Sequence, residues 1–414
     1  MTGPTASNGI EVTADPAEVG VDAGRLSRLD HRLARFVDEG RLPGWQAVVT
    51  RRGQVVHASC YGLRDVAAGL PVQPDTLFRI YSMTKPITSV AAMMLWEHGE
   101  FELTDPISRW LPEFAEPRVY LAGSDLAPAT EPATEPIRVQ HLLTHTAGLT
   151  YAFMRAHPVD ARYRSAGLDE FTSLDGTLAE MSRHWAEQPL LFQPGTGWQY
   201  SVATDVLGRL VEVISGLSLD AFFDKHILHP LGMADTWFVV PEAERSRLAE
   251  LYVATADGFT AAGALGRVAL TERWPSGGAG LVSSAHDYHR FSQLLLRGGE
   301  LDGIRLLAPS TVARMATNHL PGGADLATFG RPLYAETPLR GVGFGLGLST
   351  TVDVVASGMA ASPGDFGWGG LASTAFTVDP VRELTMLFFT QLIPSSALPI
   401  RPLLRQLVHQ ALLD

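Results

Sequence analysis

Phe78-Arg79-Ile80-Tyr81-Ser82-Met83-Thr84-Lys85-Pro86 is the stretch on which the interpretation of the whole sequence depends. A short apolar run, 76–81, leads here directly into a segment whose apolar side chains recur at helical spacing. The side chains of that apolar face are Ile87, Val90, Ala91, Met94 and Leu95. Pro86 fits the first turn of such a helix, because the first N–H groups of a helix have no intrahelical partner. The stretch therefore predicts a strand that passes into a helix at Ser82.

Ser82 and Lys85 are three residues apart, so their side chains share one face of the predicted helix. A serine hydroxyl is a weak nucleophile until a base takes its proton. A lysine held in a partly desolvated cleft can have its pKa lowered enough to be that base. The helix N-terminus also offers free backbone N–H groups. The spacing alone also fits an N-cap serine beside a solvated lysine. Other segments of the sequence are therefore needed to separate a catalytic pair from this structural alternative.

Regular apolar spacing marks further elements on both sides of this stretch. The predicted helices are 24–38, 202–215 and about 400–413. The predicted hairpins join 45–50 to 54–61 through Arg51-Arg52-Gly53, and 373–378 to 383–391 through Asp379-Pro380. Gly216 stands at the C-cap position of the middle helix.

The strand signal is strong at both ends of the chain and fades between about 105 and 275. That middle part has helical patterns and Pro-rich loops, including a tandem Ala-Thr-Glu-Pro over 129–136 that we interpret as a loop. We expect an α/β (α+β) fold: an antiparallel sheet built from both ends, flanked by terminal helices, with an inserted helical domain. The expected domains are residues 1–105 together with 275–414, and residues 106–274, with the ligand cleft between them.

The composition narrows the kinds of molecule that the protein is expected to bind. The 414 residues carry a formal net charge of −12, which disfavours a surface for nucleic acid or anionic lipid. No apolar run approaches the ~20 residues that span a bilayer, and no secretory signal is visible, so a cytoplasmic location is expected. Cys60 is the only cysteine, which excludes an intrachain disulfide and a multi-thiolate metal site.

Four segments in order resemble the class C β-lactamase-like hydrolases of the serine β-lactamase and penicillin-binding-protein superfamily. They are the S-x-x-K box at Ser82-Met83-Thr84-Lys85, His141-Leu142-Leu143-Thr144-His145-Thr146-Ala147-Gly148-Leu149, Pro194-Gly195 through Trp198-Gln199-Tyr200-Ser201, and Ser276-Gly277-Gly278-Ala279-Gly280-Leu281. The resemblance covers about residues 20–410. It implies that Tyr200 points at the nucleophile and shares proton transfer with Lys85.

The chain departs from the penicillin-recognising members at a third box. Those members usually carry Lys-Thr-Gly on a strand beside the nucleophile, and this chain has only one other lysine, Lys225, followed by His226-Ile227. At the corresponding position stands Gly367-Trp368-Gly369-Gly370-Leu371, which resembles the family VIII carboxylesterase branch. A lysine there would bind the carboxylate of a β-lactam. The tryptophan has no such charge, so we expect uncharged, more apolar acyl groups.

The resemblance also implies where the remaining site residues lie. The backbone N–H groups of Ser82 and Leu371 would form the oxyanion hole, and Trp368, Gly369 and Gly370 would lie beside the substrate. His141 and His145 have the spacing of a zinc pair but no glutamate between them, so a structural role is expected. Loops at 150–175 and 318–340 are expected to shape the pocket.

We therefore expect a carboxylesterase that cleaves small-molecule esters of short to medium acyl chains through a Ser82 acyl-enzyme, without metal or cofactor. One alternative is the same chemistry on β-lactams or D-amino acid peptides. A second is acyl transfer to an alcohol or amine instead of water. A third is a non-catalytic binding protein on the same scaffold. The oligomeric state is left open.

Overall fold

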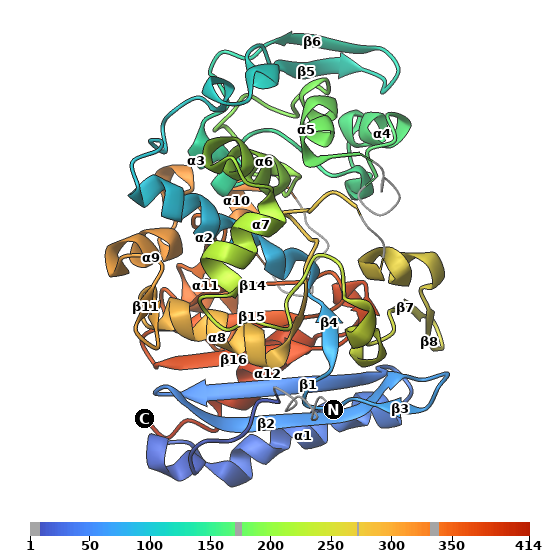
Figure 1. Cartoon of the computed structure of the whole chain (residues 1–414), viewed down its shortest axis with the longest axis vertical. Coiled ribbons are helices and arrows are strands. Elements are labelled where there is room, and N and C mark those ends of the chain that lie inside the picture. Colours follow the sequence, from blue (N-terminus) through green and yellow to red (C-terminus); the bar gives the residue numbers. More distant parts are fainter. Residues whose placement is uncertain (1–8, 170–175, 271–272, 332–338) are drawn as a thin grey trace, which may run out of the picture.

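The computed structural model describes residues 9–169, 176–270, 273–331 and 339–414 (Figure 1). Its largest element is an eight-stranded antiparallel sheet with the order β12-β13-β14-β15-β16-β1-β2-β3. Its strands are β1 (Gly44–Arg51), β2 (Gln54–Asp65), β3 (Leu70–Pro71), β12 (Val342–Phe344), β13 (Ser349–Thr351), β14 (Phe366–Gly369), β15 (Ala375–Asp379) and β16 (Leu384–Phe389). The predicted sheet from both ends of the chain is therefore confirmed.

Both predicted hairpins are present in this sheet. β1 and β2 join at Arg52 and Gly53, whose φ angles of 50° and 75° are those of a two-residue hairpin turn. β15 and β16 join after Asp379, whose carboxylate accepts the N–H of Arg382. β1 and β16 then pair directly with each other, so segments from the two ends of the chain meet at the centre of the sheet.

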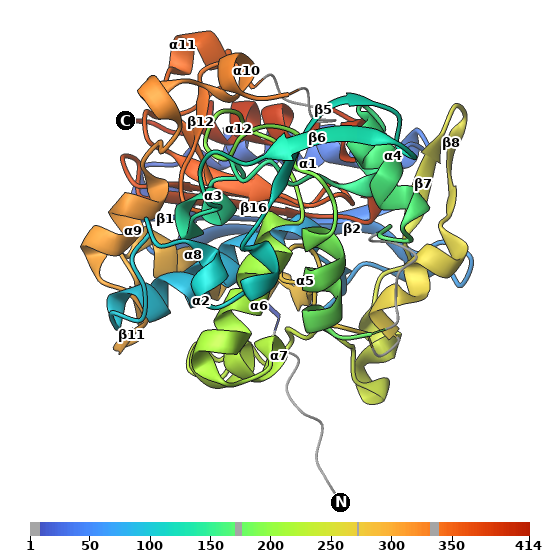
Figure 2. The same cartoon turned by 90° about the horizontal axis from the view of Figure 1, so that it is seen from above.

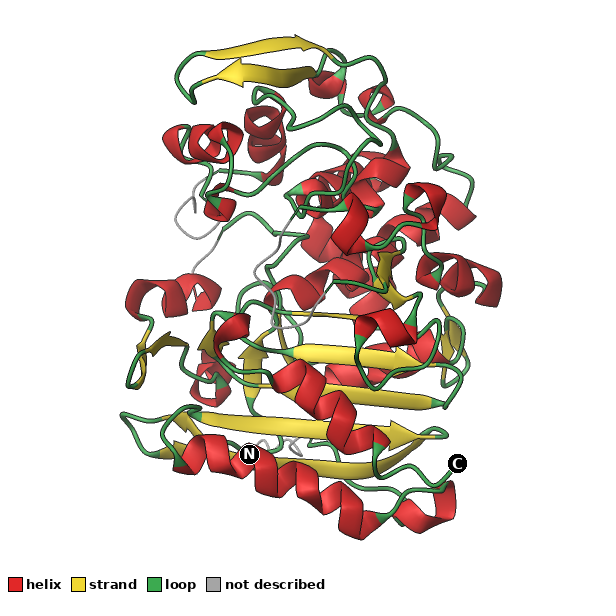
Figure 3. Ribbon diagram, turned by 180° about the vertical axis from the view of Figure 1, so that it is seen from behind, coloured by secondary structure: helices red, strands yellow, loops and turns green. Residues whose placement is uncertain are grey.

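Helices cover both faces of the sheet. The terminal helices α1 (Ala23–Asp38) and α12 (Ile400–His409) pack together on one face, as Figure 3 shows from behind. Helix α8 (Ala285–Leu296) covers the opposite face along β1, β15 and β16. Because both faces meet helices, β1 is buried along its whole length.

Helix α2 (Thr84–Glu97), which follows Ser82, is buried more completely than predicted. Every residue from Thr84 to Met93 is buried, whereas Met94 of the predicted apolar face is only half-buried. Ile87, Val90, Ala91 and Leu95 of the predicted apolar face are buried as expected, but burial extends around the whole helix because other elements enclose α2. Helix α6 (Ala203–Ser215) lies alongside it (Figure 1, Figure 2). Its polar Thr88 is satisfied by donating to the carbonyl of Gly277 at 2.6 Å.

The middle of the chain is mostly helical, as predicted, but it also contains strands. Its helices are α3 (Val139–Leu143), α4 (Pro158–Ser165), α5 (Leu178–Ala186), α6 and α7 (Leu219–Phe223). The first Ala-Thr-Glu-Pro copy is not a loop: it lies in β6 (Pro128–Pro132), paired with β5 (Arg118–Gly123). The pairing is held by Arg118, which donates to the hydroxyl and the carbonyl of Thr130. The division into two domains stays a prediction.

The sequence pattern also did not predict a second small sheet. β7 (Tyr252–Thr255) pairs with β8 (Gly258–Ala261) and, in parallel, with β17 (Leu392–Ile393). The remaining elements are β4 (Leu77–Arg79), β9 (Val282–Ser284), β10 (Glu300–Leu301), β11 (Ile304–Arg305), α9 (Pro309–Ala316), α10 (Leu326–Phe329) and α11 (Val354–Ser357). Within the described ranges, no helix has the length and apolar character to cross a membrane.

Candidate active site

Ser82 lies in a sharp turn between β4 and α2. β4 pairs with β9, and the chain then forms a short 3₁₀ turn, Tyr81–Met83, before α2 begins. Tyr81 has a φ of 44°, a conformation that costs a non-glycine residue about 1–3 kcal/mol and is common at functional sites. Met83 is the N-cap of α2 and makes no side-chain capping bond, so Ser82 does not cap the helix.

Lys85 is buried beneath Ser82. Its Nζ donates to Ser82 Oγ at 3.2 Å and to the carbonyl of Gly278 at 2.7 Å, and the residue is 1% exposed. The same Nζ lies 4.4 Å from the ring centroid of Tyr200 and 5.3 Å from that of Tyr151. The alternative with a solvated lysine is therefore wrong, and the amine is held against the hydroxyl that it would deprotonate.

Asp205 of α6 fixes the loop that holds Lys85. One carboxylate oxygen accepts the hydroxyl of Ser276 at 2.6 Å and the N–H of Gly278 at 2.9 Å. A Cβ on Gly278 would lie 2.5 Å from the other oxygen, so only glycine permits this approach. Burial raises the pKa of Asp205, while the hydrogen bond from Ser276 and the charge of Lys85 oppose that rise. Asp205 thus sets the position of the carbonyl that binds the lysine.

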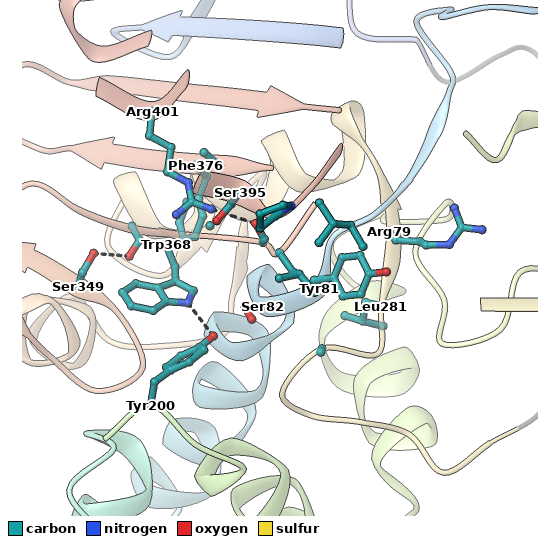
Figure 4. A pocket seen from close by; sticks show the side chains of 18 of the residues that line it. Arg79, Tyr81, Ser82, Tyr200, Leu281, Ser349, Trp368, Phe376, Ser395 and Arg401 are labelled. Carbon is teal, nitrogen blue, oxygen red and sulfur yellow. Dashed lines mark hydrogen bonds between the residues drawn. The ribbon is translucent and has the colours of Figure 1, made fainter. Parts of the chain in front are cut away.

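Tyr200 lies within an aromatic cluster beside Lys85. Its Oη accepts the indole N–H of Trp368 at 3.1 Å, as Figure 4 shows. The ring of His145 is 4.9 Å from the Tyr200 ring, and that of Trp198 is 6.2 Å away. Burial, aided by the charge of Lys85, lowers the pKa of His145 well below its usual range. His145 is therefore uncharged at neutral pH and acts as a packing residue here, as the sequence predicts.

The end of β14 approaches Ser82 from the sheet side (Figure 4). A Cβ on Gly370 would lie 2.4 Å from the carbonyl oxygen of Ile80, two residues before the serine. The N–H of Leu371 has no hydrogen-bond acceptor among the described residues. This N–H is thus available close to Ser82, where the resemblance implies an oxyanion hole.

A cavity of about 420 Å³ connects these groups. It is lined by the predicted residues Ser82, Tyr200, Trp368, Gly369, Gly370 and Leu371, whereas Lys85 lies behind its wall. Most of its remaining lining is apolar, from side chains such as Phe153, Phe238, Leu281 and Met359. The cavity therefore suits a small, mainly apolar ligand that reaches Ser82.

Several residues of the site were missed in the sequence. Asp205, Arg273 and Arg401 all line the cavity. The sequence pattern could have indicated Asp205, because it is an acidic residue within the apolar helix 202–215. No local pattern indicates either arginine as a site residue. Of the two predicted pocket loops, Tyr151, Phe153 and Leu339 do line the cavity, but 170–175 and 332–338 lie outside the described residues.

A second serine, Ser59, lies beside a histidine and an aspartate. Ser59 Oγ donates to Asp30 Oδ1 at 2.8 Å, and His57 Nε2 is within 2.9 Å of that same oxygen and 2.8 Å of Ser59 Oγ. In a catalytic triad the two histidine nitrogens face different partners, and the serine proton points to the histidine. Here one nitrogen faces both partners and the serine bonds to the carboxylate, so this cluster only joins α1 to β2.

The Ser82–Lys85 pair with its buried lysine, the facing tyrosine and the sheet-and-helix architecture are those of the β-lactamase-like serine hydrolases. A family model described as Beta-lactamase matches residues 29–409, and the chain belongs to this family.

Similar proteins agree with this assignment. Esterase EstB of Burkholderia gladioli is 36% identical over 398 residues, covering 91% of this chain and 93% of its own length. Protein Rv1367c of Mycobacterium tuberculosis is 36% identical over 367 residues, covering 87% of this chain and 89% of its own. The solved structure of EstCE1, a hydrolase with promiscuous acyltransferase activity, has a TM-score of 0.78 at 29% identity, covering 94% of this chain and 98% of its own.

Proposed function

We propose that the protein is a carboxylesterase in which Ser82 forms an acyl-enzyme with short to medium acyl chains. The observation that carries this proposal is the 3.2 Å hydrogen bond between the buried Lys85 Nζ and Ser82 Oγ, which lines the cavity. The names of EstB and EstCE1 support ester hydrolysis as the reaction. The W-G-G segment at 368–370 supports the family VIII branch.

Acylation begins with the attack of Ser82 Oγ on the ester carbonyl carbon. The serine proton passes to Lys85 Nζ, and the new oxyanion accepts the backbone N–H groups of Ser82 and Leu371. The C–O bond of the ester then breaks, and the leaving alcohol takes the proton of Tyr200 Oη. The resulting phenolate is stabilised by the Lys85 ammonium, 4.4 Å from the ring centroid, and by the indole N–H of Trp368.

Deacylation reverses these proton transfers with water in place of the alcohol. Tyr200 Oη takes a proton from the attacking water, and the second oxyanion occupies the same hole. Ser82 Oγ leaves with the proton that Lys85 carried, which regenerates the resting enzyme and releases the carboxylic acid. Every proton is thus returned, and the side chains named here complete the cycle.

The cavity wall supports a preference for uncharged acyl groups. Trp368 stands where penicillin-recognising relatives have a lysine, and apolar side chains form most of the lining. A β-lactam carboxylate would find the indole ring there instead of an ammonium group. We therefore propose ester hydrolysis ahead of β-lactam hydrolysis.

Acyl transfer is the second candidate reaction. The acyl-enzyme reacts with whichever nucleophile reaches it, and EstCE1 combines hydrolysis with acyltransferase activity. Adding a short alcohol to the assay and measuring the new ester against the free acid separates the two outcomes.

The test compares p-nitrophenyl butyrate with a chromogenic cephalosporin, using the wild type and Ser82→Ala. The proposal predicts butyrate turnover that disappears in Ser82→Ala, with little cephalosporin cleavage. Efficient opening of the cephalosporin would overturn the substrate class, and ester turnover that survives in Ser82→Ala would overturn the mechanism. The cytoplasmic location stays a prediction that cell fractionation would test.

A further inference from the structure

Arg401 of α12 lies directly against the strand end that carries the oxyanion donor (Figure 4). Its Nη2 donates to the carbonyl of Gly370 at 2.9 Å and to that of Thr374 at 3.3 Å. A Cβ on Gly369 would lie 2.3 Å from the guanidinium, so only glycine at 369 lets the arginine come this close. The sheet and the last helix are thus joined at this point by a positive charge on backbone carbonyls.

The carbonyl of Gly370 and the N–H of Leu371 belong to one peptide unit. A charged donor on the carbonyl oxygen draws electron density from the nitrogen through amide resonance, and so strengthens the N–H as a donor. It also fixes the plane of the peptide, because the oxygen points at Arg401 and the N–H must then point to the opposite side. Oxyanion donors act through this kind of prior orientation.

The neighbouring bonds hold the same turn in one conformation. The N–H of Gly370 donates to the carbonyl of Thr374 at 2.9 Å, and that carbonyl also accepts from Arg401. Thr374 Oγ1 in turn donates to the carbonyl of Ile80 at 3.4 Å, just before Ser82. Arg401 therefore orients Leu371 relative to the turn that holds the nucleophile.

We propose that Arg401 is a positioning residue for the oxyanion hole: its guanidinium fixes and polarises the Gly370–Leu371 peptide. The inference rests on the proposed function, in which Leu371 N–H binds the oxyanion. Arg401 touches no reacting atom. Its contribution is realised when negative charge develops on the carbonyl oxygen, so it affects kcat and leaves ground-state binding unchanged.

The test uses Arg401→Met, which keeps a long apolar stem and removes the guanidinium. Removal of one oxyanion donor lowers kcat by about 10²–10³-fold, and we expect a roughly tenfold or greater loss of kcat for a donor that is only misoriented. KM for p-nitrophenyl butyrate should stay within about twofold. In Arg401→Ala, added guanidinium salt should restore part of kcat. A boronic acid that forms a tetrahedral adduct on Ser82 should bind both variants more weakly in proportion to the loss of kcat.

Arg64→Met is the matched control, because Arg64 also donates to two backbone carbonyls, those of Pro71 at 2.6 Å and Ser246 at 3.3 Å, but lies outside the cavity and outside the predicted pocket loops. Its kcat should equal that of the wild type. An unchanged kcat in Arg401→Met, or a rise of KM alone, overturns the inference, and so does an equal loss in the control. If Arg401→Met does not fold, Arg401→Gln is measured by the same criteria. Loss of activity in Ser82→Ala together with normal Arg401 variants would refute this inference and leave the proposed function intact.

Discussion

Replacing Trp368 by phenylalanine tests how Tyr200 takes part in the reaction. The indole N–H donates to Tyr200 Oη at 3.1 Å, and the two ring centroids are 5.4 Å apart. Phenylalanine keeps an aromatic ring in this place but has no donor. A hydrogen bond between neutral groups contributes about 0.5–1.5 kcal/mol, and one to a charged group about 1.5–3 kcal/mol.

These two energy ranges predict different losses of kcat/KM in Trp368→Phe. If Tyr200 Oη becomes negative as the alcohol leaves, Trp368→Phe should lower kcat/KM by roughly 10- to 150-fold, since about 1.4 kcal/mol is a factor of ten. If the oxygen stays neutral throughout, the loss should be only about two- to tenfold. The proton transfer that we propose for Tyr200 therefore requires the larger loss.

The assay is p-nitrophenyl butyrate hydrolysis at neutral pH, with Trp198→Phe as the control. Trp198 stacks on Tyr200 at 6.2 Å, and its buried indole nitrogen has no hydrogen-bond partner among the described residues. Its replacement changes packing without removing a bond to Oη. Equal losses in the two variants, or a loss below tenfold in Trp368→Phe, would refute negative charge on Tyr200.

Three further predictions concern stability. Asp205→Asn should lower the free energy of unfolding by about 1–2 kcal/mol in a urea titration, because charge-assisted hydrogen bonds from Ser276 and Gly278 become neutral ones. Unchanged stability would contradict the structural role of this carboxylate. Gly347→Ala should lower the free energy of unfolding by at least about 1 kcal/mol, because φ at Gly347 is 86° and the new Cβ would lie 1.9 Å from the Oγ of Ser89 in α2. An equally stable variant in the same titration would count against this packing of α2. Burial lowers the pKa of His141 and His289 to about 4, so the unfolded chain binds more protons below pH 6.5 and stability should fall as the pH drops from 6.5 to 4. Thermal unfolding of His289→Gln should depend less on pH over this range, and an identical slope in variant and wild type would exclude His289 as a source of it.

The parts of the fold that the sequence predicts well are those with local causes. Arg52-Gly53 and Asp379-Pro380 are turn residues between alternating or apolar runs, so both hairpins follow from short-range rules. The complete burial of α2 has no such cause, because it depends on which elements surround the helix. The parallel pairing of β7 with β17 likewise joins segments about 140 residues apart, and neither strand is longer than four residues.

The site divides in the same way. Ser82 and Lys85 are neighbours on one helical turn, so their spacing predicts their contact. Tyr200 and the segment 368–371 were reached only through resemblance to known enzymes, since nothing local connects them to Ser82. Asp205 accepts the hydroxyl of Ser276 and the N–H of Gly278, and Arg401 donates to the carbonyls of Gly370 and Thr374. These partners lie in distant loops and are mostly backbone atoms, which leave no complementary charged residue in the sequence.

The central pairing of β1 with β16 has a consequence for synthesis of the protein. Gln46 lies opposite Phe389, so the middle of the sheet joins residues more than 300 positions apart. A ribosome synthesises the chain from its N-terminus, so β1 pairs with β2 but keeps one unpaired edge until residues 384–389 of β16 have been synthesised. The helix that bears Arg401 emerges later still. Premature termination before residue 384, where β16 begins, would thus leave an exposed strand edge, which makes such fragments targets for chaperones and proteases.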